Sequence, residues 1–258
     1  MPRAAAPPPA AVTARVRSLY RRLLRHYGAQ GWWPADDPFE MMIGAVLVQN
    51  TAWANARLAV AALQRAGLLD WRRLARSAPD RIAKVIRPAG TYRVKARRVS
   101  ALARHVAAHG GLDALGVLPT PVLREGLLRV HGIGAETADA ILVYAFARPG
   151  VVLDAYTRRL CARLGLAPTA HARGDAALRV LIEHALPHDA AVHGEFHALI
   201  VAHAKARCRT RAICHACPLR RGCAFAAGAC AAPDAEAVDC PPAVAAGVEI
   251  DSHPFSAD

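Results

Sequence analysis

Apolar residues recur along most of the chain at the three- to four-residue spacing of an α-helix. In the first such stretch the apolar side chains fall on one face, with the arginines mostly off it: Val16, Leu19, Tyr20, Leu23, Leu24 and Tyr27. Alternation typical of a strand is not sustained anywhere, so we expect an all-α fold. Beyond the segments described next, the periodicity predicts helices around 70–76, 79–87, 93–109, 121–130, 135–148, 154–164, 174–185 and 189–206.

One segment is apolar almost all round. Asp37 and Pro38 form a capped helix start, and the sequence MMIGAVLVQN follows. A helix without a polar face is typical of a buried position, so we expect a central helix here. Thr51 is then expected to cap the next helix, which ends near Gly67.

The segment 120–154 reads as helix, glycine hairpin, helix, short apolar run and carboxylate. Thr120 is expected at the N-cap, with Pro121 at the first helical position. The expected apolar face is Val122, Leu127, Leu128 and Val130. Gly132 and Gly134 break this helix because glycine permits positive φ and close backbone approach. The next helix would then present unpaired N–H groups at its start, which suit a phosphate oxygen.

Four cysteines stand close together in a C-x5-C-x2-C-x5-C array, namely Cys208, Cys214, Cys217 and Cys223. Such an array predicts a metal loop, and both zinc and a [4Fe–4S] cluster accept four thiolates. Only one C-x2-C pair is present, which favours the cluster over zinc. Disulfides are the alternative, but no secretion signal accompanies the array. The remaining cysteines, Cys161, Cys230 and Cys240, show no partner pattern.

The chain is strongly basic, with a formal net charge of +13. All 33 lysines and arginines lie in residues 1–223, against 14 of the 20 acids there, so this part carries +19. A polyanionic partner is therefore expected. Only Lys84, Lys95 and Lys205 are lysines, which limits any mechanism that needs an amine. No apolar run approaches membrane-spanning length.

The hairpin, the following Gly-Val-Val-Leu-Asp and the cysteine array together resemble the helix-hairpin-helix DNA glycosylases of the endonuclease III superfamily. The first interval of the array is one residue shorter than the usual C-x6-C-x2-C-x5-C of that family. The resemblance covers about residues 15–225. It implies a six-helix barrel over 38–149, a discontinuous helical domain from 14–37 and 150–223 that ends in the iron–sulfur loop, and a DNA-binding cleft between them. The segments 1–13 and 224–258 are expected to be disordered tails.

The resemblance also implies roles for individual residues. The hairpin residues Gly132, Ile133, Gly134 and Thr137 would bind a DNA phosphate, and Asp154 would act at the sugar of an extruded nucleotide. Asp154 is also a plain N-cap candidate, and both roles are compatible. Gln49, beside Asn50, would enter the vacated base stack; without the resemblance these two are a polar turn. The loop arginines that would contact DNA backbone, or otherwise face solvent, are Arg209, Arg211, Arg220 and Arg221.

One residue departs from the best-known members. Where bifunctional endonuclease III carries a Schiff-base lysine, this chain has Glu136, which cannot form an imine. Glu136 either faces the pocket or merely complements the helix dipole. The departure predicts water as the nucleophile, and so a monofunctional glycosylase.

The sequence motifs QNTAW and GIGxETADAIL resemble those of the endonuclease III-related 3-methyladenine glycosylases most. An alkylated purine is cationic, and Trp32, Trp33 and Trp53 could stack on it. We therefore expect a cytoplasmic, nucleoid-associated monomer that acts on double-stranded DNA with a damaged base and has no membrane partner. The alternatives are an endonuclease III-type glycosylase and abasic-site lyase on oxidised pyrimidines, and a non-catalytic DNA-structure binder. The carboxylate at position 154 argues against the binder.

Overall fold

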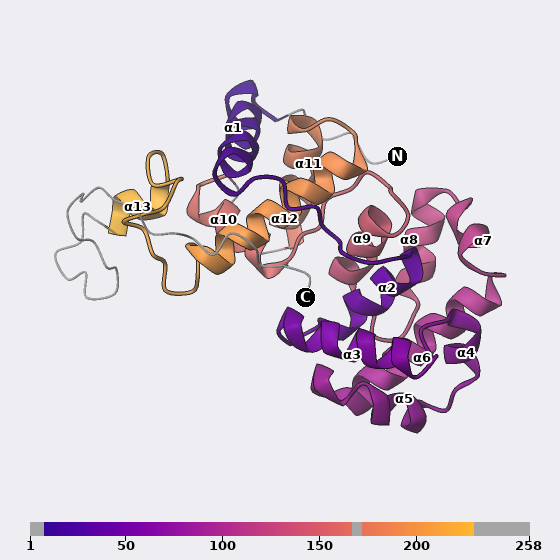
Figure 1. The fold of residues 1–258 in the computed structure, drawn as a ribbon. Helices are drawn as coiled ribbons and strands as arrows, with labels where there is room; N and C mark the ends of the chain where they lie inside the picture. Colours follow the sequence, from indigo (N-terminus) through magenta and orange to yellow (C-terminus); the bar gives the residue numbers. More distant parts are fainter. Residues whose placement is uncertain (1–7, 167–171, 230–258) are drawn as a thin grey trace. The chain divides into compact units, whose positions relative to one another are not determined.

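The computed structural model describes residues 8–166 and 172–229, and within them the protein is helical with no β-strand, which confirms the all-α prediction (Figure 1). The elements in chain order are α1 (Ala10–Tyr27), α2 (Pro38–Leu47), α3 (Trp53–Arg65), α4 (Trp71–Arg76), α5 (Pro79–Val85), η1 (Arg87–Ala89), α6 (Tyr92–Ala108), α7 (Leu112–Gly116), α8 (Thr120–Leu128), α9 (Ala135–Tyr144), α10 (Ala155–Arg163), α11 (Ala172–Ala185), α12 (Ala190–Ala206) and α13 (Ala224–Ala229). No helix in the described ranges is long and apolar enough to span a bilayer.

The chain divides into two compact units. The hairpin unit comprises residues 31–152 and 188–194, and the cysteine unit comprises residues 1–30, 153–187 and 195–258 as far as these are described. The cysteine unit is discontinuous, because the N-terminal helix joins segments from the second half of the chain. Both units consist of helices alone in their described parts.

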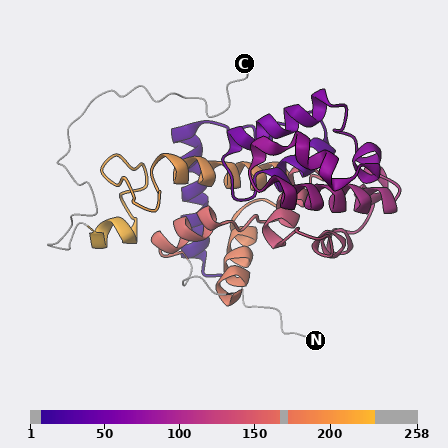
Figure 2. The ribbon, with the colours of Figure 1, turned by 90° about the horizontal axis from the view of Figure 1, so that it is seen from below.

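Helix α2 is the centre of the hairpin unit, as its apolar sequence predicts. Eight of its ten residues are buried, and α3, α6 and α9 pack against it. Its start follows the prediction, since Asp37 accepts hydrogen bonds from the backbone N–H groups of Phe39 at 2.6 Å and Glu40 at 3.0 Å. In Figure 2 the violet and magenta helices of this unit form a bundle several helices deep.

In contrast to the start of α2, the predicted starts of two further helices were wrong. Helix α3 has Ala52 rather than Thr51 at its N-cap, with no side-chain cap. Helix α8 has Pro119 at its N-cap, so Thr120 is already inside the helix and its side chain makes no capping bond. In both cases the chain enters the helix from an extended backbone one residue away from the hydroxyl. A local sequence signal does not fix such an offset.

The predicted apolar face of α8 was also partly wrong. Leu123 and Leu127 are fully buried in the core, whereas Val122 is 51% exposed and Leu128 38% exposed. Leu123 and Leu127 are four residues apart, so they lie on one side of the helix. Val122 precedes that pair by one residue and falls on the solvent side.

Two helical segments lie within the ranges that were expected to be tails. Helix α1 begins at Ala10 rather than after residue 13, and Thr13 is buried with its hydroxyl donating to the carbonyl of Ala10. Helix α13 occupies residues 224–229, at the start of the segment predicted as a tail. Both segments are rich in alanine, which favours helix. Residues 1–7, 167–171 and 230–258, with Cys230 and Cys240, lie outside the described residues.

Candidate functional site

Asp154 lies at the N-terminus of α10 and is 6% exposed. Its Oδ1 accepts a hydrogen bond of 2.6 Å from the backbone N–H of Thr157, so the residue is the N-cap of α10. Three buried apolar residues, Val151, Val152 and Leu153, precede it and fix the backbone at this point. The sequence therefore places one carboxylate at the start of a helix, where the dipole favours the anion.

The second oxygen of Asp154 faces an imidazole. Nε2 of His197, on α12, lies 3.4 Å from Oδ2, and His197 is 7% exposed. Burial by itself raises the pKa of the Asp154 carboxyl, but the hydrogen bond and charge of His197, together with hydrogen bonds from Thr157, outweigh it. The net pKa is below that of an ordinary aspartate. Asp154 is thus a buried carboxylate that stays ionised.

His197 was not identified from the sequence. It lies in an apolar helix, and no local motif connects it with Asp154. Only the packing of α12 beside the start of α10 brings the two together. A histidine at an otherwise apolar helical position is the only signal in the sequence, and most such histidines have a structural role.

The hairpin between α8 and α9 uses its two glycines differently. Gly132 has a φ of 84°, in the left-handed region that favours glycine, as predicted. Gly134 is the N-cap of α9 in extended backbone with a φ of −89°, so it does not use the positive φ that glycine allows. Ile133 is 4% exposed and packs in the core. Any contribution of Ile133 to phosphate binding therefore comes from its backbone.

Gln49 follows the end of α2 and its amide is held by the hairpin. Nε2 donates to the carbonyl of Gly132 at 3.1 Å and to Oγ1 of Thr137 at 3.0 Å. Arg98 on α6 donates from Nη1 to Oε1 of the same amide. Asn50, beside it, is exposed in the left-handed region with a φ of 52°, which asparagine tolerates.

Glu136 lies in the first turn of α9 and is exposed. Lys95, on α6 of the same unit, is 1% exposed and donates to the carbonyls of Leu47 at 2.8 Å and Ala89 at 2.6 Å. Lys95 therefore fixes the end of α2 and has no access to a substrate. Lys84 is exposed on α5.

Lys205, on α12 of the cysteine unit, is exposed. Desolvation lowers the pKa of its amine, and the charge of Asp154 partly offsets that effect. Lys205 is thus the lysine that interacts with Asp154.

Three tryptophans and a tyrosine of the hairpin unit form one aromatic cluster: Trp32, Trp33, Trp53 and Tyr144. The ring of Trp33 stacks on Trp32 at 5.4 Å and meets Trp53 edge-on at 5.1 Å between centroids. Tyr144 lies 5.7 Å from Trp33 and 6.1 Å from Trp32. All four are half-buried, so the cluster retains surface at which a flat base could stack.

The four cysteines of the array lie on the loop between α12 and α13. Cys208 and Cys214 are buried, and Cys217 and Cys223 are half-buried. Burial, followed by the proximity of the other three thiols, raises the pKa of Cys217 to about 11, although a hydrogen bond from the Leu219 backbone acts against it. Four thiolates therefore form together only when a positively charged metal compensates them.

Nitrogen groups from α10 and α12 approach these sulfurs. Arg163 donates from Nη1 to Sγ of Cys208 at 3.3 Å and to the carbonyl of Arg209 at 2.6 Å. His203, fully buried, has Nε2 3.7 Å from Sγ of Cys217, while its Nδ1 lies 2.9 Å from the hydroxyl of Tyr27. Such donors stabilise thiolate charge, so the donor set fits a thiolate-bound cluster. Within the described ranges, however, no three His, Cys, Asp or Glu side chains are arranged to hold a single metal ion.

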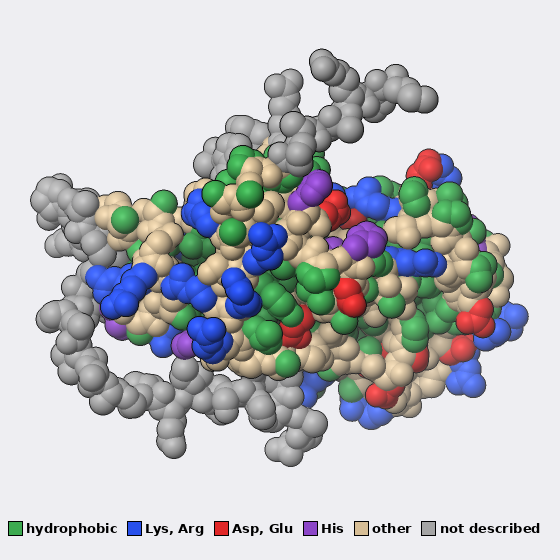
Figure 3. All heavy atoms as spheres, turned by 90° about the horizontal axis from the view of Figure 1, so that it is seen from above, with side chains coloured by type: hydrophobic (Ala, Val, Ile, Leu, Met, Phe, Trp, Pro, Cys, Tyr) green, Lys and Arg blue, Asp and Glu red, His purple; other side chains and the backbone are tan. Residues whose placement is uncertain are grey.

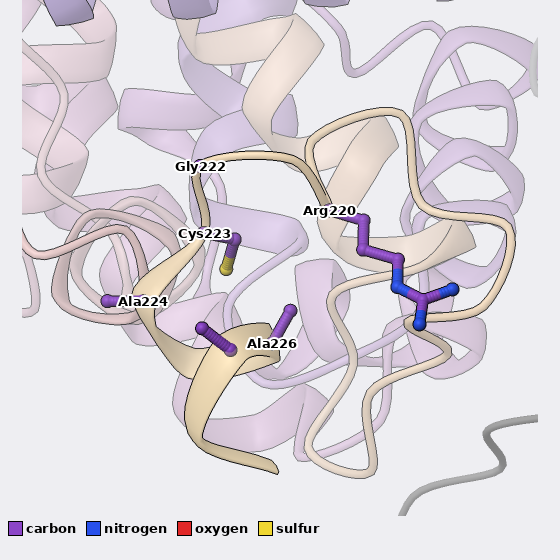
Figure 4. A pocket seen from close by; sticks show the side chains of 6 residues that line it. Arg220, Gly222, Cys223, Ala224 and Ala226 are labelled. Carbon is purple, nitrogen blue, oxygen red and sulfur yellow. The ribbon is translucent and has the colours of Figure 1, made fainter. Parts of the chain in front are cut away.

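The arginines predicted on this loop are exposed, and they are Arg209, Arg211, Arg220 and Arg221. In the space-filling view, Lys and Arg side chains gather at the end of the cysteine unit that carries α13 (Figure 3). A hollow of about 490 Å³ lies beside Cys223, lined by Arg220 and Gly222 of the loop and by three alanines of α13. Figure 4 shows the side chains that line this hollow, with Cys223 on one segment of the loop and Arg220 on the preceding turn.

Residues 43–182 match the model of the HhH-GPD superfamily of base excision DNA repair proteins. This match covers the hairpin, Asp154 and more than half of the chain. The protein belongs to the HhH-GPD superfamily. A curated relative, MJ1434 of Methanocaldococcus jannaschii, named as a DNA repair glycosylase, is 38% identical over 81% of this chain and 95% of its own length.

Two solved structures share the fold of this HhH-GPD protein. The 3-methyladenine DNA glycosylase MagIII of Helicobacter pylori, solved with 1,N6-ethenoadenine, has a TM-score of 0.62 and 27% identity, covering 76% of this chain and 96% of that one. A non-covalent endonuclease III–DNA complex has a TM-score of 0.69 and 19% identity, covering 84% and 97%. The resemblance stated from the motifs is therefore confirmed, and the chain is a DNA glycosylase of this superfamily.

Proposed function

We propose that this glycosylase is monofunctional and hydrolyses the N-glycosidic bond of alkylated purines in double-stranded DNA. The observation that carries the proposal is Asp154, a buried carboxylate whose pKa is lowered by His197 and Thr157 despite burial. A binder of DNA structure has no need of such a group. Building an ionised carboxylate into a protein interior costs free energy, and active sites are where that cost is met.

In the proposed reaction the damaged nucleotide is first rotated out of the duplex, at a cost of a few kcal/mol. The bond between C1′ and the base nitrogen then breaks, and its electron pair leaves with the base. Asp154 stabilises the positive charge that develops on the sugar. Water attacks C1′, and Asp154 accepts the proton that the water loses. A cationic alkylated purine leaves as a neutral base and needs no prior protonation.

Three features of the chain support water rather than an amine. The position of the family lysine carries Glu136, which cannot form an imine. Lys95 is buried and committed to two backbone carbonyls. Lys84 is exposed on α5, and no contact of its amine with Asp154 is found in the described residues. The alternative, a bifunctional glycosylase, is left with Lys205, whose lowered pKa is the one observation in its favour.

The proposed base specificity rests on the aromatic cluster. A cationic purine is attracted to the faces of indole rings more strongly than a neutral one. The half-buried Trp32, Trp33 and Trp53 supply such faces within one unit. MagIII, whose name gives 3-methyladenine as its base, is similar to this chain over most of its length.

We further propose that the cysteine loop holds a [4Fe–4S] cluster through Cys208, Cys214, Cys217 and Cys223. Its role there is to fix the loop so that Arg209, Arg211, Arg220 and Arg221 present guanidinium groups to DNA phosphates. The cluster takes no part in the proposed bond cleavage. Zinc is the alternative occupant.

One assay separates the monofunctional glycosylase, the bifunctional glycosylase and the non-catalytic binder. The protein is incubated with duplexes that contain 3-methyladenine, thymine glycol, uracil or a bare abasic site. Released base is measured, strand cleavage is compared with and without hot alkali, and borohydride trapping is attempted. Release of 3-methyladenine with cleavage only after alkali is expected. A trapped covalent complex would instead identify a bifunctional enzyme, and tight abasic-site binding with no base release would identify a binder.

A further inference from the structure

The amide of Gln49 is fully engaged as a donor. Its two N–H groups donate to Gly132 O and Thr137 Oγ1, so neither remains for a base. Both acceptors belong to the hairpin or to the first turn of α9, the segment expected to bind the phosphate. The side chain expected to enter the base stack is thus attached to the phosphate-binding backbone.

Arg98 completes the same arrangement from a different helix. Its Nη1 donates to Oε1 of Gln49, the end of the amide that faces away from the hairpin acceptors. Hydrogen bonds from a charged donor are about twice as strong as neutral ones. Gln49 is therefore held at both ends, by the hairpin at its nitrogen and by α6 at its oxygen.

The stem of Arg98 also lies directly on the hairpin. A Cβ atom built on Gly132 would fall 2.3 Å from Cγ, 2.5 Å from Cδ and 2.7 Å from Nε of Arg98. No side chain fits between them, so glycine at 132 is required by this contact as well as by its φ of 84°. The Nε atom of Arg98 is buried without a hydrogen-bond partner in the described part of the chain. Such an orphaned donor costs free energy, which indicates that the placement of the guanidinium is maintained for another reason.

We propose that Arg98 is a positioning residue that joins Gln49 to the hairpin, so that gripping the phosphate and inserting Gln49 into the stack occur as one event. The inference rests on the proposed glycosylase function and on the role that the family resemblance implies for Gln49, which is to fill the space that the extruded nucleotide vacates. Arg98 does not touch the reacting atoms. It acts through Gln49 and Gly132.

The test uses a lesion-independent probe. A duplex carries a tetrahydrofuran abasic analogue opposite 2-aminopurine, whose fluorescence rises when the base is unstacked. The full-length protein is mixed with this duplex in a stopped-flow instrument, and binding is measured separately by anisotropy. Arg98→Met keeps the stem on Gly132 and removes the donor. Arg97→Met, at the exposed neighbouring position of the same helix, removes the same charge and is the matched control.

Loss of a charged hydrogen bond predicts that Arg98→Met slows the fluorescence rise about tenfold, while Arg97→Met stays within about twofold of the wild type. Anisotropy should show equal losses of affinity for the two variants. In a Gln49→Ala background the effect of Arg98→Met should fall to about twofold or less, because the coupled partner is gone. Thr137→Val removes one acceptor of the Gln49 amide with little change of shape, and it should also slow the fluorescence rise. The test therefore does not depend on Arg98→Met alone if that variant misfolds.

Two results would overturn the inference and leave the proposed function standing. One is an Arg98→Met variant whose fluorescence rise is as fast as that of Arg97→Met. The other is additive effects of Arg98→Met and Gln49→Ala on the rate of that rise. A wild-type protein that binds the duplex without any fluorescence rise would remove Gln49 as the inserted residue. The inference would then fail together with the role that the resemblance implies for Gln49, while the proposed base hydrolysis would still stand. Base release in the glycosylase assay distinguishes this case from a loss of catalysis.

Discussion

The imidazole of His197 lies 3.4 Å from the carboxylate of Asp154, and both side chains are more than nine-tenths buried. The two residues come from helices α12 and α10 of the cysteine unit. The same helices contact the cysteine loop at their other ends, through His203 on α12 and Arg163 on α10. The carboxylate and the cysteine loop are therefore positioned by one pair of helices.

Replacing His197 should move the acid limb of the pH–rate profile. Burial raises the pKa of Asp154 and His197 lowers it, so His197→Ala leaves the burial effect less opposed and the carboxyl pKa rises. The rate of base release, which requires the ionised form, should then be lost at a higher pH than in the wild type. His197→Gln, which can still donate a hydrogen bond, should shift the limb less. An acid limb that does not move in His197→Ala would contradict this role.

The same shift has a consequence for stability. A carboxyl with a lowered pKa in the folded state stabilises the protein above its unfolded pKa, about 3.9 for aspartate. That stabilisation is lost as the pH falls through the lower folded value. His197→Ala should therefore reduce the free energy of unfolding at neutral pH more than at acidic pH. Urea unfolding at several pH values measures the difference, and an equal loss at every pH would count against it.

A lysine at position 136 should create covalent chemistry. Glu136 lies at the start of α9 and is exposed, so Glu136→Lys is tolerated by the fold. The wild type should give no borohydride-trapped complex with lesion-containing duplex, and Glu136→Lys should give one. Glu125→Lys, at an exposed position on α8, is the control for added charge. Trapping in the wild type that disappears in Lys205→Ala would instead identify Lys205 as the nucleophile.

The aromatic cluster should discriminate by charge. Trp53→Leu removes one ring of the cluster while leaving an apolar side chain, so excision of cationic 3-methyladenine should fall more than excision of neutral 1,N6-ethenoadenine. A loss of roughly tenfold for the cationic base corresponds to the strength of a partly desolvated cation–π contact. Trp71→Leu, on α4 and outside the cluster, is the control. Equal losses on both bases would show that Trp53 has only a packing role.

The cysteine array should determine metal content. Protein purified without oxygen should be brown, with four irons per chain, and Cys217→Ser should lose iron. Cys161→Ala should keep it, because Cys161 is buried in α10 and outside the array. Iron is measured by colorimetric assay and visible absorbance. A colourless protein with one zinc would contradict the cluster and support the alternative.

The sequence predicted those features that depend on local chemistry. Asp154 follows an apolar run and begins a helix, and the glycines of the hairpin interrupt two helical patterns, so both features were found from neighbouring residues. The chemical role expected of Asp154 came from the family resemblance. His197 and Arg98 could not be found in this way. Their partners, Asp154 and Gln49, are distant in sequence, and only helix packing brings them together. Val122 shows the limit even within one helix, because packing against other helices decided that the side with Leu123 and Leu127 is the buried one.

The proposal as a whole depends on Asp154, and Asp154→Asn tests it most directly. Asparagine can still accept the hydrogen bond from Thr157 and cap α10, so the fold and DNA binding should be unchanged. Single-turnover release of 3-methyladenine from duplex DNA should fall by about a thousandfold, because the charge that stabilises the sugar cation is gone. Undiminished release by Asp154→Asn, with normal binding, would contradict the proposal that this carboxylate performs the chemistry.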